Sequence, residues 1–304
     1  MSFDNNRAEN TLVSIIMNCF NSEKYLREAI DSVVTQTYQN WEIIFWDNCS
    51  SDNSAEVFKS YTDKRLHYFL APEFTELGEA RNLAVSFANG AWLGFLDCDD
   101  IWIPTKLEHQ VNIIKQEGSD LGIVYGQSIV INDSRKTQSK WVKSHNKYKN
   151  KTVLRRLPEG YIFKKILKFN FIPLLSAIVS KEAFKEVGGI SSHFSQAEDY
   201  ELFVKISSIK KVRAVQNIVA FRRVHDNNIS INNDQKGLDE SIEIIQRYKS
   251  QNSAKRGLSY HHSDYGLQII KGGELKVGFD YIIKYGSFKD LLAIIMRKIT
   301  RILW

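Results

Sequence analysis

The chain has 304 residues, of which 43% are hydrophobic and 25% are charged, and its formal net charge is +6. This composition is typical of a globular protein. No apolar run approaches the roughly 18 residues that cross a bilayer, so we expect no transmembrane helix. The first ten residues are polar and indicate no secretory signal. Three cysteines without a C-x-x-C pair exclude a disulfide framework and favour a reducing, cytoplasmic location.

Charge is distributed unevenly along the chain. Residues 1–134 carry 9 Lys and Arg against 20 Asp and Glu, a balance of −11, whereas residues 135–304 carry 32 against 15, a balance of +17. We interpret the acidic half as suited to a cation and the basic half as suited to a phosphate-rich partner. Residues 135–169 contain 12 Lys and Arg and one acidic residue. Residues 136–151 show neither a helix nor a strand pattern, and we predict a loop near the substrate there.

Hydrophobic periodicity predicts alternating strands and helices in the first 125 residues. The expected strands are 11–17, 41–46, 66–70, 91–96 and 121–125, and the expected helices are 22–34, 54–61, 79–88 and 104–116. Such alternation favours an α/β fold, with a mostly parallel, Rossmann-like sheet flanked by helices on both faces.

The second half of the chain has a mixed pattern. It predicts a buried strand at 171–179, helices at 181–187 and 200–209, one or two strands within 212–222, and helical structure beyond residue 231. We therefore expect two domains: an α/β domain at 1–230 and a helical C-terminal extension at 231–304.

Polar residues follow three of the predicted strands, at 18–21, 47–52 and 97–100. In open α/β sheets the carboxyl edge is where ligands bind. The third cluster contains Asp97, Asp99 and Asp100, whose carboxylates would repel one another unless a hard divalent cation bound them. The alternative is a solvated turn. We expect Asp99 to be the main ligand with help from Asp97, and Asp100 to cap the next helix.

Five segments, taken in order and spacing, resemble the family 2 glycosyltransferases of the GT-A fold. The segments are residues 13–21, residues 29–33 with 36–38, residues 41–54, residues 78–82 and residues 90–100. The resemblance covers about the first 230 residues. It implies an inverting, metal-dependent enzyme that moves a sugar from a nucleotide-sugar to an acceptor hydroxyl. No G-x-G-x-x-G segment follows the first strand, which disfavours a dinucleotide site.

By this resemblance, four residues bind the donor. Asn18 and Phe20 grip the nucleotide base, Asp47 accepts a hydrogen bond from uracil, which favours a UDP-sugar, and Arg81 lies near the diphosphate. The alternatives are core packing for Phe20 and an ordinary exposed helix position for Arg81. The chain departs from many relatives at Asn48, where they have a second acid, and at Phe20, where they have Tyr.

The resemblance also assigns the metal and the base. Mn²⁺ or Mg²⁺ would be held by Asp99 and Asp97, with His225 as a further ligand, and Asp97 would also contribute to donor binding. Asp199 would be the catalytic base, with Glu198 as support or runner-up. The alternative for this acidic pair is stabilisation of a helix N-terminus, and for His225 it is a solvated loop.

Residues 288–304 form an amphipathic helix if they are helical. Phe288, Leu291, Leu292, Ile295, Ile299, Ile302 and Leu303 fall on one face, and Arg297, Lys298 and Arg301 fall near the opposite side. This pattern suits a helix lying on an anionic membrane surface. The alternative is a helix docked on the protein with its basic residues outward.

We therefore predict a cytoplasmic glycosyltransferase acting in polysaccharide, lipopolysaccharide or glycoconjugate synthesis, with peripheral contact to the inner membrane face. Its partners would be a nucleotide-sugar and a saccharide or lipid-linked saccharide acceptor, and no nucleic acid. A nucleotidyltransferase and a non-catalytic sugar-nucleotide or glycan-binding protein are the alternatives. The first normally needs a Gly- and Lys/Arg-rich phosphate loop, which residues 18–21 do not form.

Overall fold

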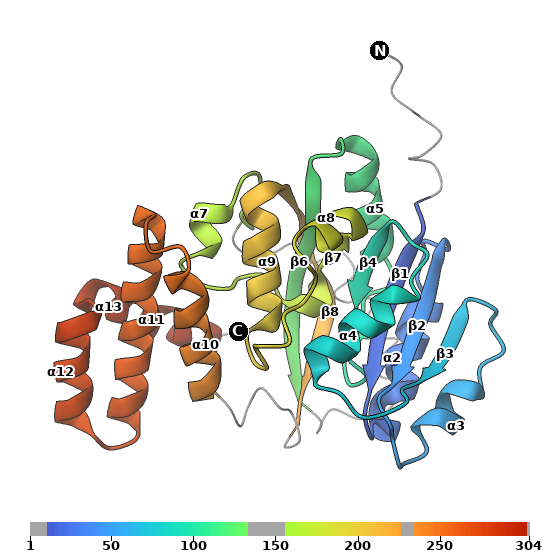
Figure 1. The fold of residues 1–304 in the computed structure, drawn as a ribbon, viewed down its shortest axis with the longest axis horizontal. Coiled ribbons are helices and arrows are strands. Elements are labelled where there is room, and N and C mark those ends of the chain that lie inside the picture. Colours follow the sequence, from blue (N-terminus) through green and yellow to red (C-terminus); the bar gives the residue numbers. More distant parts are fainter. Residues whose placement is uncertain (1–10, 133–155, 226–233, 303–304) are drawn as a thin grey trace. The chain divides into compact units, whose positions relative to one another are not determined.

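A computed structural model describes residues 11–132, 156–225 and 234–302 (Figure 1). The chain divides into two compact units, one made of Met1–Ile162 and Ile172–Asn228 and the other of Phe163–Phe171 and Ile229–Trp304. The sequence predicts a single domain boundary after residue 230. The structure differs in that the short segment Phe163–Phe171 belongs with the C-terminal helices.

The first unit is built on an eight-stranded sheet with the order β3-β2-β1-β4-β7-β6-β8-β5. Its members are β1 (Val13–Cys19), β2 (Trp41–Asp47), β3 (Leu66–Leu70), β4 (Trp92–Phe95), β5 (Ile101–Trp102), β6 (Leu121–Asn132), β7 (Ile178–Ser180) and β8 (Lys211–Val224). Among the described strands, β1 to β4 are joined by parallel pairings and β6 pairs parallel with β8, whereas β7 and β5 pair antiparallel. The predicted α/β fold is confirmed.

Helices cover both faces of this sheet. They are α2 (Glu23–Val34), α3 (Ser54–Lys59), α4 (Leu77–Ser86), α5 (Lys106–Gln116), α8 (Lys181–Glu186) and α9 (Glu198–Ile209). Figure 1 shows α4, α8 and α9 in front of the sheet and α2 behind it. Because the central strands have helices on both sides, the residues of β2 and β4 are all buried, without the alternation of a half-exposed strand. The edge strand β3 is only partly buried.

The central strands form the core of the first unit. Val13, Ile15, Ile43 and Phe45 are fully buried in one cluster with residues from α2 and α5. Gly94 of β4 lies against the ring of Trp102, where an added Cβ would come within 2.7 Å of the ring. Only a glycine at position 94 therefore leaves enough room for the indole of Trp102 beside the strand.

Three expectations about strands need correction. The predicted strand at 171–179 is wrong except at its end, because Pro173 starts a 3₁₀ turn (Leu174–Ser176) and only Ile178–Ser180 joins the sheet. Proline has no N–H to offer a ladder. The strand predicted at 121–125 continues to Asn132, and the two-residue β5 was missed. The predicted loop at 136–151 lies outside the described residues.

The second unit is helical. It contains α7 (Phe163–Ile166), α10 (Asp234–Gln246), α11 (Asn252–Lys271), α12 (Leu275–Tyr285) and α13 (Phe288–Ile302). Helices α11 and α12 approach closely at Gly266 and Gly278, where a Cβ on Gly278 would lie 2.6 Å from the carbonyl oxygen of Gly266. The predicted C-terminal helices are confirmed. Within the described ranges, no helix is both long and apolar enough to cross a membrane.

Candidate active site

Strand pairing brings the predicted site residues to one edge of the sheet. β1 runs parallel to β2, with Asn18 opposite Trp46 and Cys19 opposite Asp47. β1 also runs parallel to β4, and the Leu96 N–H donates to the Ile16 carbonyl at 3.0 Å beyond the last paired residues. The segments after β1, β2 and β4 therefore leave the sheet side by side, as expected for a ligand-binding edge.

Asp97 and Asp99 lie just beyond β4 with side chains that are 46% and 25% exposed. Burial, followed by repulsion from Asp97, raises the pKa of Asp99. The pKa of Asp100 is raised well above its usual range by burial and by the charges of Asp99 and Asp97. Negative charge is thus concentrated here beyond what nearby cations neutralise, which is the condition that favours binding of a hard divalent cation.

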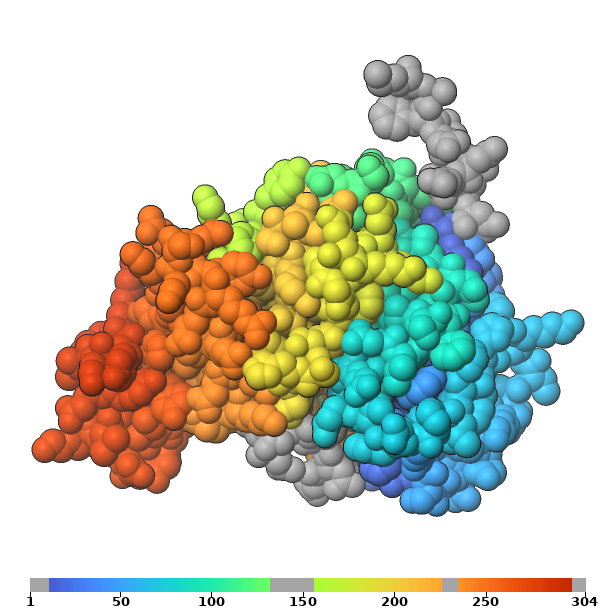
Figure 2. Space-filling model, viewed as in Figure 1, coloured from blue at the N-terminus to red at the C-terminus, as the bar shows by residue number. Residues whose placement is uncertain are grey.

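Arg81 links this acidic segment to α9. Its guanidinium is only 3% exposed, and it donates from Nη2 to Asp97 Oδ1 at 3.0 Å and from Nη1 to Glu198 Oε1 at 2.7 Å. The alternative of an exposed helix arginine is therefore wrong. The segment before α9 lies beside α4 on the face seen in Figure 2, because Asn82 of α4 donates to the Ile190 carbonyl at 2.7 Å.

Asp199 occupies the first turn of α9 next to Glu198. Burial, followed by the neighbouring carboxylate of Glu198, raises the pKa of Asp199 to about 7, and Arg81 opposes this shift in part. An aspartate with this pKa can accept a proton near neutral pH. Because Glu198 is held by Arg81, the structure favours Asp199 over Glu198 as the group able to take a proton.

His225 comes from the end of β8, and its Nε2 lies 3.0 Å from Asp99 Oδ2. The ring also packs against Tyr25 of α2, with ring centroids 5.1 Å apart and planes tilted by 31°. The structure therefore brings His225 to the acidic segment from 126 residues away in sequence. The alternative of a merely solvated histidine does not fit these contacts.

Arg223 is a site residue that sequence reasoning missed. It is buried, and it donates from its backbone N–H to Asp100 Oδ1 at 2.8 Å and from Nε to the Asp99 carbonyl at 2.9 Å. Its Nη2 donates to Glu28 Oε2 at 2.7 Å. Asp100 therefore anchors β8 instead of capping the next helix, which begins after Thr105. The signal was available, since Arg223 precedes His225 by two residues and shares its side of the strand.

On the donor side of the site, Phe20 is 51% exposed and meets the 55% exposed Phe74 edge to face, with ring centroids 5.0 Å apart. Core packing, the alternative for Phe20, is therefore wrong. The amide nitrogen of Asn18 is buried and has no hydrogen-bond partner among the described residues. A hydrogen-bond donor, the Asn18 amide, and an aromatic surface thus lie together at the end of β1.

Asp47 is 1% exposed, and both of its carboxylate oxygens accept hydrogen bonds. Oδ1 accepts from the Ser50 N–H at 2.8 Å and Oδ2 accepts from the Tyr68 hydroxyl at 2.6 Å. Asn48 stands where many relatives have an acid. Its side-chain Nδ2 donates to the Thr75 carbonyl, and its Oδ1 accepts from the Thr75 N–H. In this arrangement both residues shape the loops beside the site, and direct contact of Asp47 with a base stays a prediction.

The loops after β1 and β2 are clasped together in a strained conformation. Asn21 and Cys49 have positive φ angles of 49° and 65°. Asn21 Oδ1 accepts from the Ser51 N–H at 2.8 Å, and the Asn21 N–H donates to Ser50 Oγ at 3.0 Å. Positive φ in residues other than glycine concentrates at functional sites, where the surrounding contacts impose it.

Within the described residues, no group of three or more His, Cys, Asp or Glu side chains converges as a metal site. Mg²⁺ and Mn²⁺ do not require such a cluster, because they use one or two carboxylates and take other ligands from phosphates and water. Asp99 and Asp97 fit this mode, with mutual repulsion and partly exposed side chains.

Comparison with known proteins agrees with this geometry. A model of the family described as "Glycosyl transferase family 2" matches residues 14–187, which is more than half of the chain. This chain belongs to glycosyltransferase family 2. The family match supports a glycosyltransferase domain and disfavours the nucleotidyltransferase alternative.

Three relatives of this family 2 member are informative. It is 31% identical over 204 residues to WfgD of Escherichia coli, a UDP-Glc:α-D-GlcNAc-diphosphoundecaprenol β-1,3-glucosyltransferase, covering 67% of this chain and 73% of WfgD. It is 30% identical to an uncharacterized glycosyltransferase of Rickettsia typhi, covering 71% of this chain and 64% of the relative. For a relative from Rickettsia felis, the match covers only 34% of the relative.

Solved structures confirm the GT-A fold of this family 2 member. TarS of S. aureus with UDP-GlcNAc has a TM-score of 0.61 at 17% identity, covering 77% of this chain and 64% of TarS. The mannosyltransferase PcManGT of Pyrobaculum calidifontis, with GDP-Man and Mn²⁺, has a TM-score of 0.62 at 14% identity, covering 96% of this chain and 80% of PcManGT.

The buried bridge made by Arg81 should contribute strongly to stability. Replacing Arg81 by Ala would leave Glu198 buried without its cation, and we expect a loss of about 3–5 kcal/mol in the free energy of unfolding, measured by urea titration. Arg247→Ala is the matched control, because Arg247 pairs with Glu243 at a surface where both side chains are nearly half exposed. Its expected loss is about 0.5 kcal/mol. Equal losses in the two variants would contradict a special role for Arg81.

Proposed function

We propose that this family 2 enzyme is an inverting, metal-dependent transferase that moves a sugar from a UDP-sugar to an acceptor hydroxyl. One observation carries the proposal: Arg81 joins Asp97 of the acidic segment to Glu198, so that Asp199 is held next to the same site. The two acidic clusters are about 100 residues apart in the sequence, and each is explained equally well as ordinary turn or helix chemistry when taken alone.

The donor is proposed to bind along the ends of β1 and β2. Phe20, with Phe74 beside it, offers an exposed aromatic surface for the base, and the Asn18 amide offers a hydrogen-bond donor. Asp47 is proposed to accept the N3–H of uracil after a local adjustment of its contacts. The names of WfgD and WfaP of E. coli specify UDP-Glc, and TarS was solved with UDP-GlcNAc, which supports uridine as the base.

Asp99 and Asp97 are proposed to hold Mn²⁺ or Mg²⁺, with His225 at Asp99 as a further ligand or as a hydrogen-bond partner that orients the carboxylate. A bound divalent ion would offset the negative charge that grows on the departing diphosphate. The structural neighbour PcManGT contains Mn²⁺. Arg81 is proposed to act by positioning these acids, since two of its nitrogens are occupied by Asp97 and Glu198.

Asp199 is proposed to act as the catalytic base. It takes the proton from the acceptor hydroxyl while that oxygen bonds to the anomeric carbon of the donor sugar. The bond between the anomeric carbon and the diphosphate oxygen breaks in the same displacement, and the leaving group departs as UDP with the bonding electron pair. Attack from the side opposite the leaving group inverts the anomeric configuration.

The acceptor is proposed to be a saccharide or a lipid-linked saccharide, used in the synthesis of polysaccharide, lipopolysaccharide or another glycoconjugate at the cytoplasmic face of the membrane. WfgD and WfaP are named for activity on a diphosphoundecaprenol-linked sugar, which supports a lipid-linked acceptor. Peripheral contact of the second unit with that membrane is part of this proposal.

Removal of the main metal ligand should weaken donor binding only when metal is present. For Asp99→Ala we expect UDP affinity in Mn²⁺ to fall about tenfold or more, which corresponds to the loss of about 1.4 kcal/mol of binding energy. Titration calorimetry in Mn²⁺ and in EDTA measures this, with GDP as the competing base. Asp63→Ala is the control. Asp63 lies just before β3, an edge strand of the sheet, and thus at the opposite end of that strand from the site. An Asp99→Ala protein with wild-type affinity in Mn²⁺ would refute the assignment.

Removal of the proposed base should separate binding from chemistry. We expect Asp199→Asn to keep its affinity for UDP and Mn²⁺ but to lose about 10²–10⁴ in the rate of transfer, because a positioned general base contributes that much. Transfer is measured as the radiolabelled sugar that moves from the UDP-sugar to the acceptor, and binding is measured by calorimetry. Normal turnover by Asp199→Asn would show that another group is the base.

The pH dependence of transfer should report the raised pKa of Asp199. A base is active when deprotonated, and the pKa of Asp199 is about 7. We therefore expect kcat/KM to be half-maximal near pH 7, to approach its plateau about one pH unit higher, and to fall about tenfold per pH unit well below pH 7. UDP binding measured at each pH controls for loss of the donor complex. An acid limb centred near the ordinary aspartate pKa of about 4 would contradict the assignment.

A further inference from the structure

The second unit has an unusual surface. Of the 16 large hydrophobic side chains exposed to solvent in the described residues, nine lie between residues 275 and 296, in α12 and α13. Single exposed apolar residues are normal on any protein, but a concentration of this kind marks a site of interaction. The described part of the first unit, although much larger, has the other seven.

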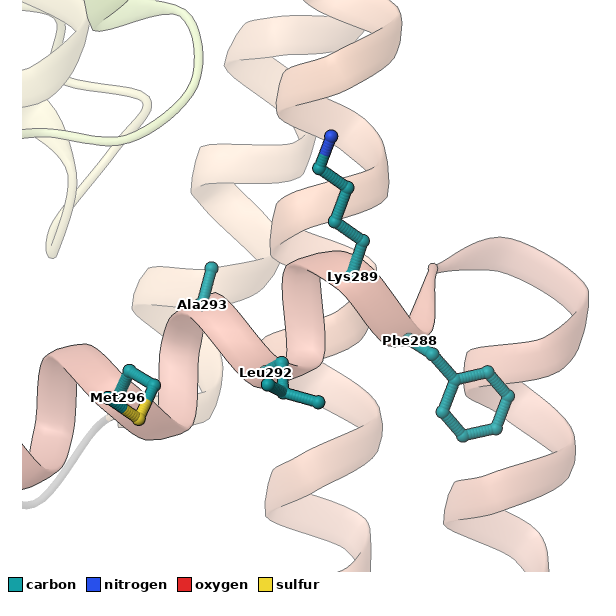
Figure 3. A pocket seen from close by; sticks show the side chains of 5 residues that line it. All are labelled: Phe288, Lys289, Leu292, Ala293 and Met296. Atoms are coloured by element: carbon teal, nitrogen blue, oxygen red, sulfur yellow. The ribbon is translucent and has the colours of Figure 1, made fainter.

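Helix α13 is held by one edge and exposed along another. Leu291 and Ile294 are buried, whereas Phe288, Leu292 and Met296 are 55%, 65% and 55% exposed. These three residues, here called the α13 row, are spaced four apart and so share one side of the helix. Figure 3 shows Phe288, Leu292 and Met296 with Lys289 and Ala293 around a shallow hollow on this helix. The helix therefore docks on its unit along one side and presents a second apolar side to solvent.

Helix α12 repeats the pattern. Leu275, Phe279 and Ile283, here called the α12 row, have the same spacing of four, and all three are exposed. Tyr281 lies two positions from Phe279 and thus on roughly the opposite side of α12, where its hydroxyl lies 2.9 Å from His262 Nδ1 of α11. Helix α12 is therefore attached to its unit on one side and presents the α12 row on another.

The charges around both rows are mainly positive. Residues 275–302 contain six Lys and Arg against two Asp, a balance of +4. Lys276, Lys284 and Lys289 are exposed next to the two rows. One of the two acids, Asp290, is turned toward its own unit, where it accepts hydrogen bonds from Ser259 and Ser287. The other acid, Asp280, is exposed four residues from both Lys276 and Lys284. By sequence the stretch still has an excess of basic residues, of which Arg297, Lys298 and Arg301 are three. The two helices therefore combine exposed apolar side chains with an excess of basic residues.

We propose that the α12 and α13 rows dock this chain on the surface of an anionic lipid bilayer. The apolar rows enter the boundary between headgroups and acyl chains, and the lysines pair with anionic headgroups. This docking surface rests on the proposed function, because a lipid-linked acceptor is the reason why the enzyme would need a membrane. It adds which helices and which side chains make the contact.

A second copy of the chain is a poorer fit for this surface. A two-fold interface places the same patch against itself. The lysines of one copy would then face those of the other, and like charges across an interface oppose association. Lysine is also depleted in the buried core of protein interfaces. A bilayer instead lets each lysine extend its stem along the apolar surface while its ammonium group stays at the headgroups.

The test is co-sedimentation of the full-length protein with vesicles, in the absence of donor and acceptor. We expect binding to phosphatidylcholine mixed with phosphatidylglycerol, and much weaker binding to phosphatidylcholine alone or at high salt. Leu292→Glu with Met296→Glu should lower the partition coefficient at least about tenfold. Lys284→Glu with Lys289→Glu should lower it about tenfold on the anionic vesicles only.

Val277→Glu is the matched control. Val277 is an exposed apolar residue of α12, but it lies two positions from Phe279 and thus on roughly the opposite side of the helix. We expect its vesicle binding to equal that of the wild type. Absence of wild-type binding to anionic vesicles would overturn the proposal. Equal losses for Val277→Glu and the α13 variant would also overturn it.

Sedimentation velocity without vesicles tests the competing occupant. A wild-type dimer that Leu292→Glu with Met296→Glu converts to a monomer would identify the surface as a protein interface and overturn the proposal. Hydrolysis of UDP-sugar, measured on the same samples, separates this inference from the proposed function. We expect the α13 variant to hydrolyse donor at the wild-type rate. Vesicle binding by a protein that handles no UDP-sugar would refute the enzyme proposal and leave the docking surface intact.

Discussion

The site depends on the buried guanidinium of Arg81. This one cation is 3% exposed and reaches Asp97 at 3.0 Å on one side and Glu198 at 2.7 Å on the other. A buried charge is tolerated only when partners satisfy it. The position of α9 is therefore coupled to the acidic segment after β4 by electrostatics as well as by packing, and Asp199 is carried along with Glu198 because the two are neighbours in the first turn of α9.

The same bridge leaves an excess of negative charge. Arg81 neutralises part of a cluster that contains Asp97, Asp99, Glu198 and Asp199, and the pKa values of both Asp99 and Asp199 are raised. Raised pKa values mean that both groups gain from a positive partner. For Asp99 the proposed partner is a divalent cation, and for Asp199 it is the proton of the acceptor. A single electrostatic imbalance thus supports both proposed steps of the reaction, donor activation and proton removal.

Opposite the bridge, β8 closes the other side of the site. Arg223 ties Asp99 and Asp100 to Glu28 of α2, and its guanidinium lies over Tyr25, 4.5 Å from the ring centroid. Tyr25 in turn packs against the ring of His225. The acidic segment is therefore fixed from two directions by two buried arginines. This preorganisation is what a site for phosphate and metal requires, because the ligands must be in place before the substrate arrives.

Much of this could be predicted from local signals in the sequence. The order of strands β1 to β4 follows from apolar runs and turn residues, and the polar clusters after them follow from the rule that parallel strands end at one edge. The strand predicted at 171–179 failed because Pro173 overrides its apolar composition. The partners of Arg81 and Arg223 could not be predicted, since each lies more than 100 residues away from at least one of them.

The sequence by itself determined the class of fold, the family resemblance and the set of acids that define the site, because these depend on periodicity, residue type and spacing along the chain. Only the tertiary structure decided what each side chain does there. It placed Arg81 in the interior, exposed Phe20 beside Phe74, and gave Asp100 to β8. It also divided the apolar face of α13 between docking and solvent. Burial and partner choice depend on distances between distant segments, and those distances exist only once the chain has folded.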